Sequence, residues 1–251
     1  MTRQRLFRDT IAVWPNTVHL ERAIAVVRDM RGCSRTVLLS PNFFLAHGPS
    51  GMRCFFELGI RNVILDLRLL GTPKEIWQCV TEAAKHGVKA ISVHAMTGTR
   101  PLEIAVEAAK ASQLTTLKTQ PPRILVSLLP RTLGPAAMID DLGMRVKRAG
   151  HVSAATAAAI TAQADGIIAE YEDLKDIRRV SKEIPILVFA QKAAHNYKEV
   201  ELPVDQAKPS IATLLNAHAD HIIFDSTFVE RTDVEWASDL IVKELAAIAS
   251  P

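Results

Sequence analysis

The sequence predicts an α/β protein folded as a single (β/α)8 TIM barrel that takes up residues 1–251 as one domain. The length of 251 residues suits one large barrel and is enough to bury a sizeable core. Short β-branched runs alternate with longer segments of helical period along the whole chain. Strands that are joined by helical crossovers must be parallel, and eight such units in this length fit a barrel better than an open doubly wound sheet.

The expected strands are short, mostly apolar runs, as is typical of a sheet that is covered on both faces. There are eight of them: Ile11–Trp14, Thr36–Ser40, Asn62–Arg68, Ala90–Ala95, Arg123–Leu129, Gly166–Glu170, Ile186–Gln191 and His221–Asp225. Amphipathic stretches between them predict helices, and several open with Pro or with a Ser/Thr cap. These stretches include Leu20–Met30, Pro73–His86, Pro101–Ala111, Ser153–Ala164 and Pro209–Ala217.

Charge and composition narrow the classes of partner. The 30 Lys and Arg residues and 27 Asp and Glu residues leave a net charge of +3, which is spread along the chain, so nucleic acid is not an expected partner. The basic stretch Thr2–Arg8 fits a disordered terminus or a solvated first turn, and no apolar stretch follows it as a secretion signal requires. No membrane span is expected, and the odd set Cys33, Cys54 and Cys79 without a C-x-x-C pair favours the reducing cytoplasm.

In a barrel of this kind, chemistry takes place at the C-terminal ends of the strands. The polar residues expected there are Ser40, Asp66, Arg68, His94, Ser127, Arg131, Glu170, Gln191, Lys192, Asp225 and Ser226. Asp66 and Arg68 are the strongest of them, because they are two apart inside the apolar run Val63–Leu70 and therefore face one side of a strand. For any single residue of the set, a structural ion pair explains the sequence equally well.

No cofactor is predicted, because the sequence has neither a G-x-x-x-x-G-K-[ST] loop nor a G-x-G-x-x-G fingerprint. No metal is predicted either: Asp66, Glu170 and Asp225 could meet in a barrel mouth, but they have no ligand spacing. His94 is open to a catalytic or a structural role. The long polar segment Gln191–Lys208 is either a lid or a disordered loop.

Five segments together resemble one family. They are Asn42–Pro49 (NFFLAHGP), Val63–Pro73 (VILDLRLLGTP), Val93–Gly98 (VHAMTG), Ala164–Ile168 (ADGII) and Ala219–Phe224 (ADHIIF). In this order and spacing they resemble the orotidine 5'-monophosphate decarboxylases and the wider superfamily that includes hexulose-phosphate synthase and keto-gulonate-phosphate decarboxylase. The resemblance implies a TIM barrel and a homodimer that builds its sites at the subunit interface, with Phe43–Phe44 and Phe55–Phe56 as apolar surface for it.

The catalytic pattern of that family is largely replaced. At the three positions of the family's Asp-x-Lys-x-x-Asp motif, this chain has Asp66, Arg68 and Gly71. Leu38 stands at the strand-two position where the decarboxylases have a Lys and the synthases have a magnesium-binding Glu. An Arg at position 68 holds its proton too tightly, with a pKa above about 12, to protonate a carbanion easily. Trp14 stands where the family has the ribose-binding Asp. Asp225 and Ser226 stand at the phosphate-binding turn, where a carboxylate repels phosphate.

Three functions follow from this pattern. The first is a repurposed enzyme of the lyase or decarboxylase type, acting on a small anionic or polar substrate at the barrel mouth. Its expected catalytic residues are Asp66, Arg68 and His94, and its expected substrate-binding residues are Ser127, Arg131, Glu170, Lys192, Asp225 and Ser226. The second is a pseudoenzyme that binds a ligand or a protein without chemistry. The third is an orotidine 5'-phosphate decarboxylase with an unusual active site.

Overall fold

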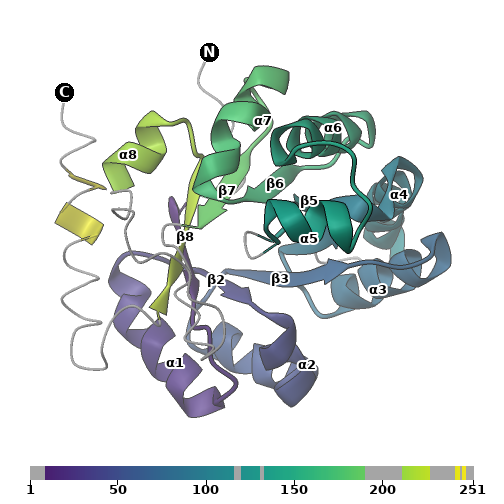
Figure 1. Ribbon diagram of the computed structural model, residues 1–251. Helices are drawn as coiled ribbons and strands as arrows, with labels where there is room; N and C mark the ends of the chain where they lie inside the picture. The colour runs from purple at the N-terminus through teal and green to yellow at the C-terminus, as the bar shows by residue number, and fades with distance from the viewer. Residues whose placement is uncertain are drawn as a thin grey trace.

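A computed structural model describes residues 9–115, 120–130, 133–189, 211–226, 241–243 and 245–246. Eight parallel strands pair in sequence order and close on themselves, so the predicted (β/α)8 barrel is confirmed (Figure 1). The strands are β1 (Ile11–Trp14), β2 (Thr36–Leu39), β3 (Asn62–Leu69), β4 (Ala90–His94), β5 (Arg123–Ser127), β6 (Gly166–Ala169), β7 (Ile186–Phe189) and β8 (His221–Asp225).

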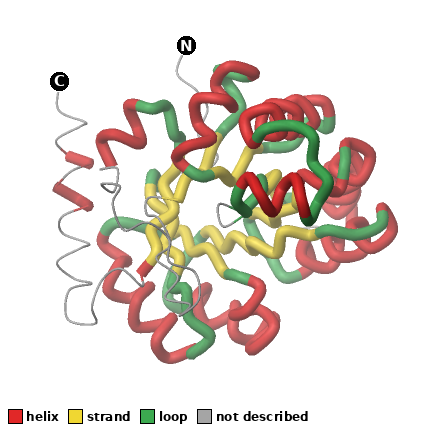
Figure 2. Tube along the Cα trace, viewed as in Figure 1, coloured by secondary structure: helices red, strands yellow, loops and turns green. Residues whose placement is uncertain are grey.

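Helices surround the strands on the outside of the barrel (Figure 2). They are α1 (Leu20–Asp29), α2 (Pro41–Glu57), α3 (Pro73–Lys85), α4 (Thr99–Thr115), α5 (Pro135–Asp140), α6 (Arg148–Thr161), α7 (Leu174–Val180) and α8 (Ile211–Asn216). Short 3-10 turns, η1 (Met30–Gly32), η2 (Ala95–Thr97) and η3 (Tyr171–Asp173), lie in the connections. Helix α3 begins in a capping box, in which the side chains of Thr72 and Glu75 each accept a hydrogen bond from the other's backbone N–H.

The core has two layers. The larger one lies between the strands and the helices, and the smaller one fills the inside of the barrel. The inner layer takes one residue from each strand: Ala12, Leu38, Ile64, Ala90, Leu125, Ile168, Leu187 and Ile223. Because side chains alternate along a strand, the residues two positions further on also face inward, towards the C-terminal mouth. This mouth layer consists of Trp14, Ser40, Asp66, Ser92, Ser127, Glu170, Phe189 and Asp225. An apolar floor therefore lies beneath a polar mouth.

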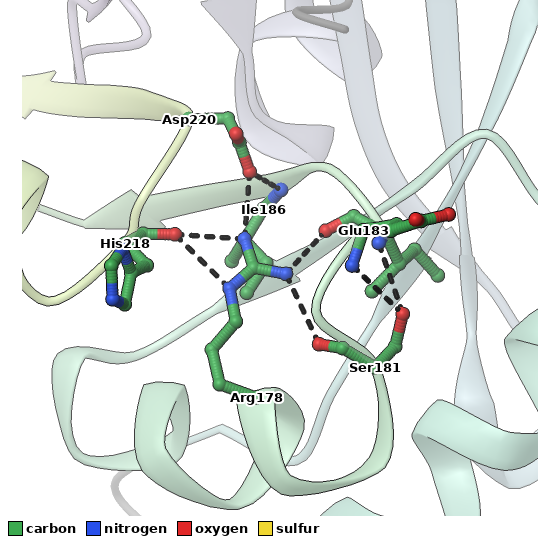
Figure 3. A network of polar contacts seen from close by, with 7 residues as sticks. Arg178, Ser181, Glu183, Ile186, His218 and Asp220 are labelled. Carbon is green, nitrogen blue, oxygen red and sulfur yellow. Dashed lines mark hydrogen bonds and ion pairs between the residues drawn. The ribbon is translucent and has the colours of Figure 1, made fainter. Parts of the chain in front are cut away.

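The N-terminal end of the barrel is held by a buried ion pair (Figure 3). The Arg178 guanidinium of α7 donates to Asp220 Oδ2 at 2.8 Å, to the His218 carbonyl at 2.7 Å and to the Ile184 carbonyl at 2.7 Å. Asp220 Oδ2 also accepts from the backbone N–H of Ile186 at 2.9 Å, and Arg178 is only 5% exposed. This network fixes α7 to the beginnings of β7 and β8.

The phenylalanines expected at a dimer interface do not form an exposed apolar surface. Phe43 and Phe55 offer no surface, because they are 2% and 0% exposed in the core, where their rings pack 5.6 Å apart between centroids. Phe44 and Phe56 are partly buried against the same core. Within the described ranges, no helix is long and apolar enough to cross a membrane.

Candidate functional site

At the mouth, β3 and β4 carry a network of Asp66, Arg68 and Ser92. The buried Asp66 carboxylate accepts a hydrogen bond on Oδ2 from Arg68 Nε at 3.1 Å, and Arg68 Nη2 lies 3.1 Å from the same oxygen in an ion pair. Its Oδ1 accepts from Ser92 Oγ at 2.7 Å, and the same hydroxyl accepts from the backbone N–H of Arg68 at 2.7 Å. Each of the three residues is thus bonded to the other two.

The backbone at Arg68 is strained. Its φ of +48° lies in the left-handed region, and the pairing of β3 with β4 shifts register between Leu65 and Leu69. A non-glycine residue in such a conformation costs on the order of 1–3 kcal/mol and persists only where its surroundings hold it, which often occurs at functional sites. Irregular strand pairing also re-aims side chains beside active sites. The bonds to Asp66 and Ser92 hold Arg68 in this conformation.

His94 ends β4, two residues after Ser92. Its Nδ1 accepts a hydrogen bond from the backbone N–H of Met96 at 3.1 Å, so the proton of the neutral ring lies on Nε2. Burial lowers the pKa of His94, the charges of Arg68 and His151 lower it further, and Asp66 acts in the opposite direction. His94 is therefore a neutral imidazole that offers one N–H donor.

His151 lies near His94, in the first turn of α6. Burial, followed by the charge of Arg148, lowers the pKa of His151. Its Nε2 is buried and has no hydrogen-bond partner among the described residues, and the same is true of Trp14 Nε1 in the mouth layer. Buried polar atoms are normally paired in native proteins.

Arg148 positions this part of α6. It forms a two-pronged ion pair with the buried Asp173 of η3, Nε to Oδ1 at 2.8 Å and Nη2 to Oδ2 at 2.7 Å. Its Nη2 also donates to the carbonyl of Leu129, just beyond β5, at 2.9 Å. The pair ties α6 to the ends of β5 and β6 and so fixes the place of His151, three residues later.

The predicted residues on β8 form a second cluster with the loop after β1. Asp225 Oδ2 accepts from Asn16 Nδ2 at 2.9 Å, and Ser226 Oγ donates to the Pro15 carbonyl at 2.6 Å. Both Asp225 and Ser226 are buried. Trp14 of the same region packs edge-on against Phe189, with ring centroids 5.5 Å apart. Polar contacts of β8 are thus directed towards β1.

The other predicted residues are distributed around the mouth or lie outside the described residues. Ser127 ends β5, is buried and lies opposite His94 in the strand register, whereas Glu170 precedes η3. Arg131, Lys192 and the 191–208 segment lie outside the described residues. Among the described residues, no three His, Cys, Asp or Glu side chains are grouped so as to hold a metal ion.

Ser92, His151 and Arg148 were not among the residues predicted from the sequence. Ser92 had a signal, because it lies two residues before His94 on one strand and so shares its face. His151 and Arg148 come from a helix, and no local pattern relates them to the strand ends. Their place in the mouth depends on how α6 packs.

The chain is similar to several proteins that share one name. No protein-family model matches the chain. The chain is 28% identical over 186 residues to an orotidine 5'-phosphate decarboxylase from Lysinibacillus sphaericus. This alignment covers 71% of this chain and 77% of the relative. It is 22% identical over 248 residues to the decarboxylase of the same name from Gloeothece citriformis, across 97% of this chain and all of the relative. The crystal structure of orotidine 5'-phosphate decarboxylase from Lactobacillus acidophilus superposes with a TM-score of 0.77 at 16% identity, over 94% of this chain and 98% of that one.

Proposed function

Because the chain belongs to the orotidine 5'-phosphate decarboxylase superfamily, we propose that it is a divergent enzyme of the decarboxylase or lyase type, acting on a small anionic or polar substrate at the barrel mouth. The observation that carries the proposal is the network of Asp66, Arg68 and Ser92. It combines a buried carboxylate, a partly exposed guanidinium and a strained backbone at the C-terminal ends of two strands. Sites in this fold occupy that end of the barrel.

Arg68 is the group that binds the substrate's negative charge. Its side chain is 34% exposed, and its bonds to Asp66 use Nε and Nη2 and leave Nη1 to donate to a carboxylate or an oxyanion. Asp66 holds the guanidinium in place. His94 adds a neutral Nε2–H donor, which stabilises a developing oxyanion without needing to be charged.

The same groups limit the reaction type. Loss of carbon dioxide from orotidine monophosphate leaves a carbanion that must be protonated, and Arg68 does not release its proton at neutral pH. The fixed positive charge of Arg68 instead favours reactions in which negative charge develops on a substrate oxygen. Slow turnover of orotidine monophosphate is therefore expected.

The test is the loss of orotidine monophosphate absorbance with the purified protein and an Arg68→Lys variant that restores the family's proton donor. We expect little turnover by the wild type and a measurable gain in the variant. Arg179→Lys, in the exposed ion pair with Asp176, is the matched control and should change nothing. Robust turnover by the wild type would show that the chain is instead a decarboxylase with an unusual site, the function that the names of its relatives favour.

A pseudoenzyme is the second candidate, and one observation favours it. Asp66 and Arg68 neutralise each other, as a purely structural pair would. A pseudoenzyme would bind its ligand with no chemical change in the wild type or in any variant. The enzyme proposed here should lose turnover in Asp66→Asn, because Arg68 loses the bonds that hold it.

We also propose a homodimer in a reducing, cytoplasmic setting. Leu70, Trp77 and Met96 are 66%, 38% and 44% exposed on the β3–β4 side of the barrel. Thr97 Oγ1 donates to the Gly71 carbonyl at 3.3 Å and so brings the loops that carry Leu70 and Met96 together. All three cysteines are free thiols. Sedimentation should show a dimer that Leu70→Ser weakens, and a wild-type monomer at micromolar concentration would refute the dimer.

A further inference from the structure

A groove of about 400 Å³ lies at the N-terminal end of the barrel, opposite the mouth. Lys89 immediately precedes β4, Arg123 begins β5, and Asp165 immediately precedes β6. Lys110 of α4 and the glutamines Gln113, Gln120 and Gln163 complete its polar lining, and two prolines and several aliphatic side chains form its wall. Grooves of this size with convergent polar groups on an apolar wall are typical of small-molecule sites.

We propose that this groove is a second binding site, which takes a phosphate dianion, either free or as the phosphate ester of a small metabolite. The proposal is independent of the function proposed for the mouth, because it uses none of the same residues and lies at the other end of the barrel. It rests on three features of the groove: its charge, its hydrogen-bond donors and the adjacent backbones of two of its cationic residues.

The charge of the groove is strongly positive. Lys89, Lys110 and Arg123 face a single carboxylate in the lining, that of Asp165, which leaves two positive charges in excess. Both oxygens of Asp165 are already engaged, because Oδ1 accepts from Arg123 Nη1 at 3.2 Å and Oδ2 accepts from the backbone N–H of Ile124 at 2.8 Å. Two excess charges match a phosphate dianion.

The groove is also rich in donors. Lys89 Nζ donates to Gln120 Oε1 at 2.7 Å, and Lys110 Nζ donates to Gln163 Oε1 at 3.2 Å. Gln120 and Gln163 therefore each use the carbonyl oxygen on a lysine and keep the NH2 group for another acceptor. Among the described residues, neither lysine forms an ion pair. Ammonium, guanidinium and amide groups together suit a ligand with several acceptor oxygens.

Two of the cations belong to residues whose backbones are adjacent. The backbone N–H of Arg123 donates to the Lys89 carbonyl at 2.9 Å, and Arg123 lies opposite Ala90 in the β4–β5 register. Burial lowers the pKa of Lys89, and the charge of Arg123 lowers it further. An anion between the two side chains removes that repulsion, so the groove gains more from a bound anion than separate surface cations would.

The rate at which Lys89 is acetylated reports on binding at this groove and not at the mouth. The full-length protein is treated with a limiting amount of an acetylating reagent, in inorganic phosphate or in sodium chloride of the same ionic strength, and each lysine is quantified by peptide mass spectrometry. At about five times its Kd, phosphate leaves about one sixth of the sites free, so labelling of Lys89 should slow about sixfold. Lys85, exposed in a pair with Glu82, is the internal control and should be unaffected.

Variants separate this groove from the mouth. Arg123→Gln and Lys110→Gln should each reduce the protection of Lys89 by phosphate, and Arg68→Met, at the mouth, should leave it intact. Lys110 is exposed, so its variant keeps the test valid if Arg123→Gln fails to fold. Equal labelling of Lys89 in phosphate and chloride would overturn the proposal, as would full protection in a folded Arg123→Gln or Lys110→Gln protein.

Discussion

Coupling between Asp66 and Arg68 can be measured by a double-mutant cycle with Asp66→Asn, Arg68→Met and the double variant. Arg68 makes two contacts of 3.1 Å to Asp66 Oδ2, and the side chains are 34% and 3% exposed. Removing one partner of a fully buried pair costs about 3–5 kcal/mol, but the exposure of Arg68 screens part of that energy. We therefore expect each single variant to lower the free energy of unfolding by about 2 kcal/mol.

The double variant should lose less than the sum of the two, with a coupling energy of about 1–2 kcal/mol, because neither partner is then left with an unpaired charge. For a chain of this size, each single variant should lower Tm by about 4–8 °C. Urea unfolding followed by circular dichroism measures the free energies, with Arg179→Met at the exposed pair with Asp176 as the control. Additive effects, with coupling below about 0.3 kcal/mol, would refute the paired geometry on which the site depends.

Three further outcomes are expected. Arg178→Met should lower the free energy of unfolding by about 3–5 kcal/mol in urea unfolding, because it leaves Asp220 buried without its cation, and a value under 1 kcal/mol would contradict the buried network of Figure 3. Ser92→Ala should cost about 1–3 kcal/mol, since it removes the acceptor of the Arg68 N–H and a donor to Asp66, and Ser153→Ala on the exposed face of α6 is its control. The pKa of His94 is lowered in the folded protein, so the unfolded chain binds a proton first as the pH falls, and the free energy of unfolding should decrease below about pH 6.5. His94→Gln should make this decrease smaller in thermal melts between about pH 5 and pH 8. An unchanged slope would contradict the lowered pKa.

The barrel could be predicted because each strand is indicated by the residues of its own segment. Runs such as Ile11–Trp14 and His221–Asp225 are apolar and β-branched, and the structure places both strands at these bounds. Some other strands end one or two residues sooner than predicted, as β5 does at Ser127, because its pairing with β4 and β6 stops there. Helix α2 was not among the predicted helices. It is kinked at Gly48, which has a φ of +54°, and it contains Pro49, so its sequence does not show one continuous helical period.

The site was only partly visible in the sequence. The spacing of Asp66 and Arg68 placed two charges on one strand, and they contact each other in the structure. The register shift that accompanies the positive φ of Arg68 depends on how β3 pairs with β4. The sequence of β3 alone does not indicate that pairing. His151 reaches the mouth through the packing of α6, so only the tertiary structure brings it near His94.

Ligand-induced stabilisation tests the central claim most directly, since the claim is that Arg68 binds the negative charge of a substrate. Thermal melts are recorded with a panel of small carboxylates and phosphate esters for the wild type, Arg68→Met and Arg123→Gln. A ligand at about 100 times its Kd stabilises the folded state by about 2.7 kcal/mol, which is a shift of several degrees. We predict at least one compound that raises the Tm of the wild type and of Arg123→Gln but not that of Arg68→Met. If every stabilising compound raises the Tm of Arg68→Met as much as that of the wild type, the mouth site does not depend on Arg68.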